Sequence, residues 1–445
     1  MRVRSRWKTG ALALSLLAAS AAVTTGGPAG RTVSAADFTC SDTATPITFW
    51  SWIPGIGSAV DAFNESHPDI CVTLEDEGNN HDEYNKIEEA MAAGSGAPDV
   101  AEIEYDELPS MEYDGYLVDL SAYGADSIQS DFVPWAWNEV SSNGAVYAIP
   151  GDAGPMALLY NQALLDRYDI AVPTTGDAFL VDATLLHTLD PSASFIDFSP
   201  TDLLWMLALM AQDNAWPFTY DGGSTVGIDF DGPAQLAFAT FWQTMLTTGE
   251  AGTTADFTPA YFSALDGGSV ATWPTAAWGP SYFELAASKS IGDWRVAPLP
   301  TWPLQSNPDV SWGGSAYPVF TQSAHPAQAA EFAEWLNSSA AAWSDEDAAP
   351  SSLFPTYLPT LDSTAFQQET APLTGDSYPN ETFVAAMKNV TAQSWPPIMS
   401  YAVDQVNITF YPVQEGTETL AQAFVQFQNE LVAYAESEGF TVTTS

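Results

Sequence analysis

The chain of 445 residues is too long for a single ordinary hydrophobic core, and we expect two or more lobes. With 46% hydrophobic and 15% charged residues, the composition indicates a folded protein and not a disordered one. The formal net charge of −46 argues against nucleic acid and anionic membranes as partners, because both repel an acidic surface. The acids are spread along the chain without a calcium-loop motif, so we read them as a solvated surface and predict no metal and no cofactor.

Residues 1–36 have the pattern of a secretory signal peptide. A basic start is followed by an apolar run over 11–23 and then by small residues up to Ala36. The apolar run is too short to span a membrane as a helix. We therefore expect an exported protein that is extracellular or associated with the cell surface. The residues before Cys40 do not match a lipoprotein signal, so we do not expect a lipid anchor.

Residues 47–75 predict a βαβ unit. A β-branched and aromatic run predicts a buried strand, a helical pattern follows it, and a second apolar strand begins at Ile70. Such a unit requires a parallel sheet with a right-handed crossover. Ligands bind beyond the carboxyl ends of parallel strands, so we expect Trp50 and Trp52 to help line a cleft. The two alternate along the strand and only one can face a given side, which favours Trp52, nearer the carboxyl end.

The chain has two cysteines, Cys40 and Cys71. Outside the cytoplasm, an even number of cysteines is typical of a disulfide framework. Cys40 precedes the first predicted strand and Cys71 opens the second, so a bridge would join neighbouring strands. The alternative is a pair of buried thiols, and we predict the disulfide.

Periodicity predicts further elements along the chain. Strands are expected over 101–103, 144–150 and 156–161, and helices over 86–93, 108–116, 203–211, 234–246, 327–337 and 420–438. The glycine-rich step at 151–155 is a candidate passage between lobes, and the polar loop at 345–350 is a second one.

Several segments follow one another in the order of a known family. After 47–52, residues 94–100 read Gly-Ser-Gly-Ala-Pro-Asp-Val and residues 115–120 read Gly-Tyr-Leu-Val-Asp-Leu. The later segments are 146–150, 159–161, 170–173, 268–278, 296–300 and 313–314. In this order they resemble the extracellular solute-binding proteins of ABC importers, in the carbohydrate-binding, maltose-binding-protein-like branch.

The resemblance implies a two-lobed α/β fold of the periplasmic-binding-protein type II, with a ligand cleft between the lobes and about three hinge crossings. On this basis we place the first lobe in 37–152 and 302–349, and the second in 153–301 and 350–445. It also implies the extracytoplasmic substrate-binding component of an ABC transporter, which closes by a hinge motion on a mono- or oligosaccharide and delivers it to permease subunits in the membrane. Such a protein is not an enzyme, and we expect a monomer.

A sugar offers apolar ring faces that stack on aromatic side chains and hydroxyl groups that bond to carboxylates and amides. The candidate ligand-binding residues are Trp50, Trp52, Asn80, Tyr105, Asp106, Asp152, Trp216, Trp278, Trp312, Gly313, Gly314 and Trp395. For the tryptophans the alternative is a place in a hydrophobic core, and for the aspartates a solvated loop. For the glycine pair it is a sharp turn.

Catalytic patterns are weaker. The four histidines lie outside any metalloprotease-type motif, and neither a Gly-x-Ser-x-Gly elbow nor a Walker loop is present, so we predict no catalytic residue. A secreted glycosidase needs only a pair of carboxylates, and it stays open as the alternative function. A lectin-like β-sandwich is disfavoured by the βαβ unit.

Overall fold

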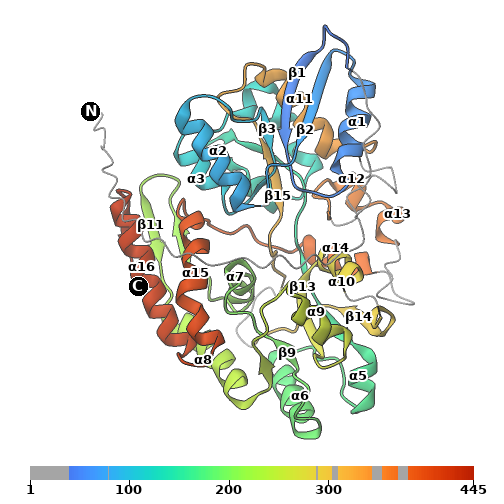
Figure 1. Cartoon of the computed structure of the whole chain (residues 1–445), viewed down its shortest axis with the longest axis vertical. Coiled ribbons are helices and arrows are strands. Elements are labelled where there is room, and N and C mark those ends of the chain that lie inside the picture. Colours follow the sequence, from blue (N-terminus) through green and yellow to red (C-terminus); the bar gives the residue numbers. More distant parts are fainter. Residues whose placement is uncertain are drawn as a thin grey trace, which may run out of the picture. The chain divides into compact units, whose positions relative to one another are not determined.

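The computed structural model describes residues 40–78, 80–286, 289–302, 309–342, 353–368 and 379–444 (Figure 1). These residues belong to one compact unit, 38–445. The predicted signal peptide, 1–36, and the candidate passage at 345–350 lie outside the described residues. Within the described ranges, no helix combines the length and the apolar character needed to cross a membrane.

Strand β1 (Thr45–Trp50), helix α1 (Ile56–Ser66) and strand β2 (Ile70–Glu75) form the predicted βαβ unit (Figure 1). β1 pairs in parallel with β2 and, on its other side, with β3 (Val100–Ala101), so the sheet order is β2-β1-β3. The buried hydrophobic residues of α1 recur at helical spacing and are Ile56, Ala59, Val60 and Phe63. The parallel unit predicted from the sequence is confirmed.

The two cysteines form the predicted disulfide. Cys40 lies just before β1 and Cys71 lies in β2, with 5.8 Å between their Cα atoms. The bridge therefore ties the start of the chain's first strand to its parallel neighbour.

Replacing both Cys40 and Cys71 with serine is expected to lower the free energy of unfolding by roughly 2–3 kcal/mol, because the bridge constrains a loop in the unfolded chain. Urea unfolding of the variant and the parent protein measures the difference. A reducing agent should produce the same loss in the parent protein and leave the variant unchanged. Equal stability of the two proteins would contradict a structural role for the bridge.

A second, antiparallel sheet brings together distant parts of the chain. β15 (Ser315–Pro318) lies between β4 (Ile103–Glu104) and β7 (Ala148–Pro150), in the order β4-β15-β7. A bridge between Val100 and Val319 joins this sheet to the β2-β1-β3 sheet. The chain therefore returns to its first region after residue 314.

The other large sheet and the long helices come from the intervening and final segments. β8 (Met156–Asn161) pairs antiparallel with β13 (Thr272–Ala276) and β14 (Trp294–Ala297). The long helices are α7 (Leu203–Gln212), α8 (Pro233–Thr248), α15 (Met399–Gln414) and α16 (Leu420–Ser437), and α15 lies beside α16 (Figure 1).

Further helices are α2 (His81–Ala93), α3 (Leu108–Tyr113), α4 (Pro134–Glu139), α5 (Gln162–Arg167), α6 (Gly176–Leu189), α9 (Pro259–Asp266), α10 (Gly279–Ala286), α11 (Pro326–Ser338), α12 (Leu358–Leu361), α13 (Thr364–Gln367) and α14 (Pro379–Met387). Short strands are β5 (Ser141–Ser142), β6 (Ala145–Val146), β9 (Ile196–Asp197), β10 (Phe218–Tyr220), β11 (Thr225–Ile228), β12 (Ala251–Gly252) and β16 (Thr441–Thr443). The helices predicted over 203–211, 234–246, 327–337 and 420–438 are confirmed, whereas the one predicted over 108–116 ends at Tyr113.

Buried hydrophobic residues form two clusters. The first surrounds β1, β4 and β15 and also takes in Trp273 and Trp294 from β13 and β14. The second is built mainly by α7, α8, α15 and α16. Because the first cluster extends into β13 and β14, the lobe boundaries predicted from the sequence stay a proposal. We place the last passage between the clusters after Val390, which packs in the first, and before Ile398, which packs in the second.

Candidate functional site

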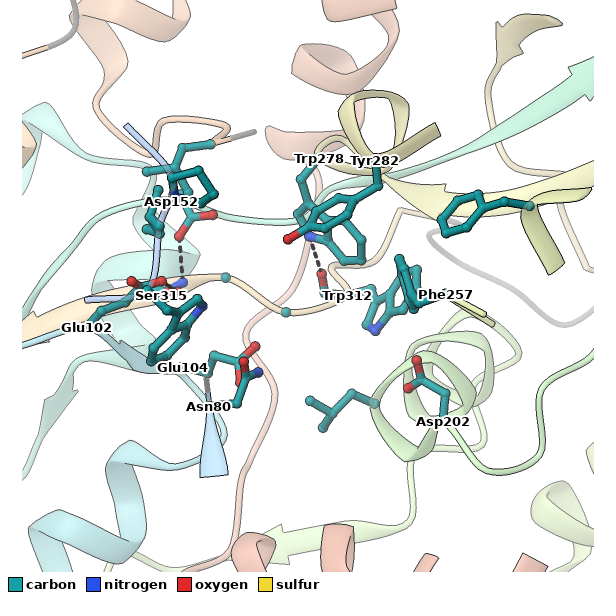
Figure 2. A pocket seen from close by; sticks show the side chains of 18 residues that line it. Asn80, Glu102, Glu104, Asp152, Asp202, Phe257, Trp278, Tyr282, Trp312 and Ser315 are labelled. Carbon is teal, nitrogen blue, oxygen red and sulfur yellow. Dashed lines mark hydrogen bonds between the residues drawn. The ribbon is translucent and has the colours of Figure 1, made fainter. Parts of the chain in front are cut away.

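A cavity of about 460 Å³ is lined by residues of both hydrophobic clusters and by polar side chains between them (Figure 2). Most of its carboxylates and an amide lie on one side, and aromatic rings lie across from them, with the Asp202 carboxylate on the side of the rings (Figure 2). We call these two sides the acidic wall and the aromatic wall. The acidic wall consists of Asn80, Glu102, Glu104, Asp152 and Ser315, and the aromatic wall of Phe257, Trp278, Tyr282 and Trp312.

The acidic wall is held by hydrogen bonds between neighbouring strands. The hydroxyl groups of Ser51 and Ser315 donate to the two carboxylate oxygens of Glu102, at 2.6 and 3.1 Å. The backbone N–H of Ser315 donates to Asp152 Oδ1 at 2.8 Å (Figure 2). Because β15 lies between β4 and β7, it brings the carboxylates that accompany those two strands to one side of the cavity.

Glu104 is fixed through one of its oxygens. Asn80 Nδ2 donates to Glu104 Oε2 at 2.7 Å, and the Tyr84 hydroxyl donates to the same oxygen at 3.3 Å. The Tyr84 oxygen in turn accepts the backbone N–H of Glu104 at 3.0 Å. Asn80 precedes the first residue of α2, with a φ of 43° and a ψ of −114°, and its amide lies against the wall there.

The acidic wall has no counter-charge among the described residues that line the cavity. Among the described lining residues, none is lysine, arginine or histidine. Burial raises the pKa of Asp152 to about 7. Burial, and then the charge of Asp106, raise the pKa of Glu104. The wall therefore offers many hydrogen-bond acceptors and favours ligands that donate hydrogen bonds or carry positive charge.

The aromatic wall is a group of rings in mutual contact. The centroids of Trp278 and Trp312 are 4.5 Å apart, and Trp278 Nε1 donates to the carbonyl oxygen of Trp312 at 3.3 Å (Figure 2). Phe257 lies 5.8 Å from each of these rings, and Tyr282, one turn along α10, lies 5.7 Å from Trp278. Phe257 and Tyr282 are 38% and 44% exposed, unusual for large apolar rings, so this wall presents a surface for a ligand to cover.

The glycine pair makes a tight turn beside the cavity. Gly313 and Gly314 have φ values of 68° and 121°, which other residues rarely adopt. A Cβ atom at Gly314 would lie 2.8 Å from the Cα atom of Ala153, so a side chain does not fit there. The glycine pair therefore makes the sharp turn and also lines the cavity, and its contact with a ligand stays a proposal.

The structure divides the candidates predicted from the sequence into three groups. Those that line the main cavity are Trp52, Asn80, Asp152, Trp278, Trp312, Gly313 and Gly314. Tyr105, Asp106 and Trp395 line a smaller neighbouring cavity, which Gly313 also borders. Trp50 and Trp216 line neither of these two cavities.

The two tryptophans outside both cavities have other partners. Trp50 Nε1 donates to Glu75 Oε2 at 2.8 Å, and the ring is buried in the first cluster. The ring of Trp216 packs at 4.8 Å against that of Trp395. The alternation along β1 thus turns Trp52 toward the cavity and Trp50 away from it, and we drop Trp50 and Trp216 from the proposed site.

Several lining residues were not among the sequence candidates. They are Glu102, Glu104, Asp202, Phe257, Tyr282 and Ser315. Three of them had a signal: Glu102 and Glu104 are two residues apart, in and just after the third predicted strand, and Tyr282 follows Trp278 at helical spacing. Asp202 begins α7 and accepts the backbone N–H of Trp205 at 2.8 Å, which is an ordinary helix cap and gives no sign of a site.

No cation site is evident in the described part of the chain, because no three His, Cys, Asp or Glu side chains there are grouped to hold a metal ion. The walls instead combine ring faces for stacking with fixed acceptors for hydroxyl groups. This is the chemistry that recognises a polyhydroxylated ring.

The chain is similar to proteins whose names state a carbohydrate ligand. An arabinooligosaccharide-binding protein of Halalkalibacterium halodurans is 24% identical over 305 residues. The matched part is 65% of this chain and 66% of that relative, which is just under two thirds of its length. A binding protein of an ABC transporter from B. animalis subsp. lactis, solved with β-1,6-galactobiose, is 27% identical, with a TM-score of 0.77 over 90% of this chain and all of that one.

A galacto-N-biose- and lacto-N-biose I-binding protein of an ABC transporter from Bifidobacterium longum is 25% identical, with a TM-score of 0.79 over 91% of this chain and all of that one. These likenesses over nearly the whole chain confirm the two-lobed α/β fold of type II binding proteins that the sequence predicted. The profile of the bacterial extracellular solute-binding protein family matches residues 51–343, more than half of the chain, and the chain therefore belongs to this family.

Proposed function

We propose that the protein binds a mono- or oligosaccharide in the main cavity and delivers it to the membrane permease of an ABC transporter. The observation that carries this proposal is that the acidic wall and the aromatic wall face each other across one cavity of about 460 Å³. Rings such as Trp278 and Trp312 stack on the apolar face of a sugar, while carboxylates such as Asp152 and Glu104 accept its hydroxyl hydrogens. Such a hydrogen bond contributes roughly 0.5–1.5 kcal/mol, and up to about 3 kcal/mol where the carboxyl group is ionised.

The similar proteins support the same ligand class, since their names state arabino-oligosaccharide, β-1,6-galactobiose and lacto-N-biose as ligands. The protein acts as an exported monomer outside the cytoplasm and catalyses no reaction on the sugar. Each hydrophobic cluster supplies residues to the cavity lining, so a ligand touching both walls stabilises a closed arrangement of the two lobes.

Titration of the protein with saccharides tests this function. We expect a saturable change in tryptophan fluorescence with at least one member of a panel of arabino-, galacto- and gluco-disaccharides, because Trp52, Trp278 and Trp312 line the cavity. Sorbitol, a polyol without a ring, serves as the control and should give no saturable change. Absence of binding across the panel would contradict the proposal. Release of reducing ends during prolonged incubation would favour the alternative, a secreted glycosidase with a carboxylate pair.

A further inference from the structure

A small second cavity of about 20 Å³ adjoins the main one, and Leu204 and Gly313 line both. Its wall combines aromatic rings with carboxyl groups; the rings are Tyr105, Trp135 and Trp395, and the carboxyl groups are Asp106 and Glu139. A volume of this size holds one group as large as a water molecule and excludes a sugar ring. The small cavity therefore suits a single substituent that projects from a ligand in the main cavity.

Asp106 is the residue of this cavity that most needs a partner. It is only 5% exposed and, apart from its own backbone N–H, no group in the described part of the chain donates a hydrogen bond to its carboxylate. A buried carboxylate without a partner is costly, by several kcal/mol for an ionised one. The titratable groups that face it are also acids, Glu104, Glu107 and Glu139, and none of them supplies a positive charge.

The carboxyl groups differ in charge near neutral pH. Burial raises the pKa of Glu139 to about 8, so this group is mostly protonated at pH 7.5. Burial raises the pKa of Asp106 to about 6, so this group is mostly ionised at the same pH. The small cavity then holds about one negative charge of its own, which one positive charge on a ligand would balance.

Four of the other polar groups of the cavity have their hydrogens committed elsewhere. The Tyr105 hydroxyl donates to the carbonyl oxygen of Asp152 at 3.0 Å, and Trp135 Nε1 donates to that of Met387 at 2.9 Å. The Trp395 indole donates to Glu139, and the Ser311 hydroxyl donates to the carbonyl oxygen of Gly313. For the oxygen of a neutral hydroxyl, the donors that remain are the protonated Glu139, Thr391 and Gln393, whereas the ionised Asp106 offers only acceptors. An ammonium group has three hydrogens and no acceptor, and aromatic rings attract it.

We propose that the bound saccharide carries a protonated amino group, which enters the small cavity and pairs with Asp106 among the rings of Tyr105, Trp135 and Trp395. This inference rests on the proposed function and narrows its ligand class to amino sugars. Sugars with a carboxylate are excluded, because the acids of both cavities repel them.

Matched sugars that differ in one substituent test the inference by isothermal titration calorimetry at pH 7.5. The probes are disaccharides of β-1,4-linked glucosamine, of its N-acetylated form and of glucose, with galactosamine, N-acetylgalactosamine and galactose as a second set. In at least one set the free amine should bind at least tenfold more tightly than the hydroxyl and N-acetyl forms. Equal affinities within every set would overturn the inference and leave saccharide binding in place, whereas no binding of any probe would remove the proposed function as well.

The Asp106→Asn variant tests the residue. In this variant, the ratio of the affinity for the free amine to the affinity for the hydroxyl form should fall toward one. Asp126→Asn, which removes an exposed acid of the same type, should retain the ratio of the parent protein. Thermal unfolding of both variants shows whether they fold. If Asp106→Asn does not fold, the same titrations of the parent protein at pH 7.5 and at pH 5 test the role of Asp106. As Asp106 and its acidic neighbours take up protons, the preference for the amine should shrink several-fold, and a preference that stays constant contradicts the inference.

Discussion

Replacing Trp278 with alanine is expected to weaken saccharide binding by about a hundredfold, which corresponds to about 2.7 kcal/mol. The ring lies at the centre of the aromatic wall, in contact with Trp312, Phe257 and Tyr282. Its loss removes a stacking surface and leaves the neighbouring rings without support. Large aromatic side chains that are covered on binding carry effects of this size. Calorimetry with the tightest-binding member of the saccharide panel measures the change.

Two further variants make the Trp278 result specific. Trp278→Phe keeps a flat ring and should recover most of the affinity. Trp335→Ala removes an indole of the same size from α11, where it packs against Phe63 outside the main cavity, and should leave the affinity unchanged. Binding by Trp278→Ala that equals the parent protein would show that the aromatic wall does not hold the ligand.

The second large effect is a loss of stability as the pH rises from 5 to 8. Burial raises the pKa of Glu83 and Glu139 to about 8 and that of Asp152 to about 7, from ordinary values near 4. At pH values between the ordinary and the raised pKa of a group, the folded protein holds a proton that the unfolded chain has released. The free energy of unfolding therefore falls as the pH increases. Each group contributes at most about 1.4 kcal/mol per pH unit. Relaxation of the structure around the new charges makes the total smaller than the sum of the three contributions. We expect the free energy of unfolding to drop by on the order of 5 kcal/mol between pH 5 and pH 8.

Urea unfolding at pH 5 and pH 8 measures this drop, and Glu83→Gln identifies one source of it. Glu83 is fully buried in α2, and neither of its carboxylate oxygens has a hydrogen-bond partner in the described part of the chain. The neutral amide should stabilise the protein by about 2 kcal/mol at pH 8 and change little at pH 5. Glu65→Gln, at an exposed position in α1, is the matched control and should change little at either pH. Stability that stays level or rises toward pH 8 would contradict this account.

The sequence predicted the parts of the fold that depend on local patterns. The βαβ unit of 47–75 follows from apolar periodicity and from Pro68, and both are local properties of the chain. The disulfide followed from the exported context and from the places of Cys40 and Cys71 beside the two strands. The lobe assignments were harder, because Trp273 and Trp294 pack with a hydrophobic cluster built mainly by distant segments.

The site was predicted only in part, because its walls form through long-range pairing. Glu102 and Glu104 accompany strands of two residues each, and their place in the wall depends on pairing with β15, more than two hundred residues away. No local pattern indicates such a partner. The preference for Trp52 over Trp50 agrees with the cavity, because strand alternation is local. Trp216 resembled the other candidates in its sequence context but lines neither cavity, and it packs against Trp395, which lines the smaller one.

A crystal structure of the protein grown with a saturating amount of its tightest-binding saccharide is the most direct test of the central claim. We expect a sugar ring in the main cavity, with its apolar face on Trp278 or Trp312 and its hydroxyl groups within hydrogen-bond distance of Glu104 or Asp152. A saccharide bound elsewhere on the protein, with the two walls left uncovered, would contradict the account.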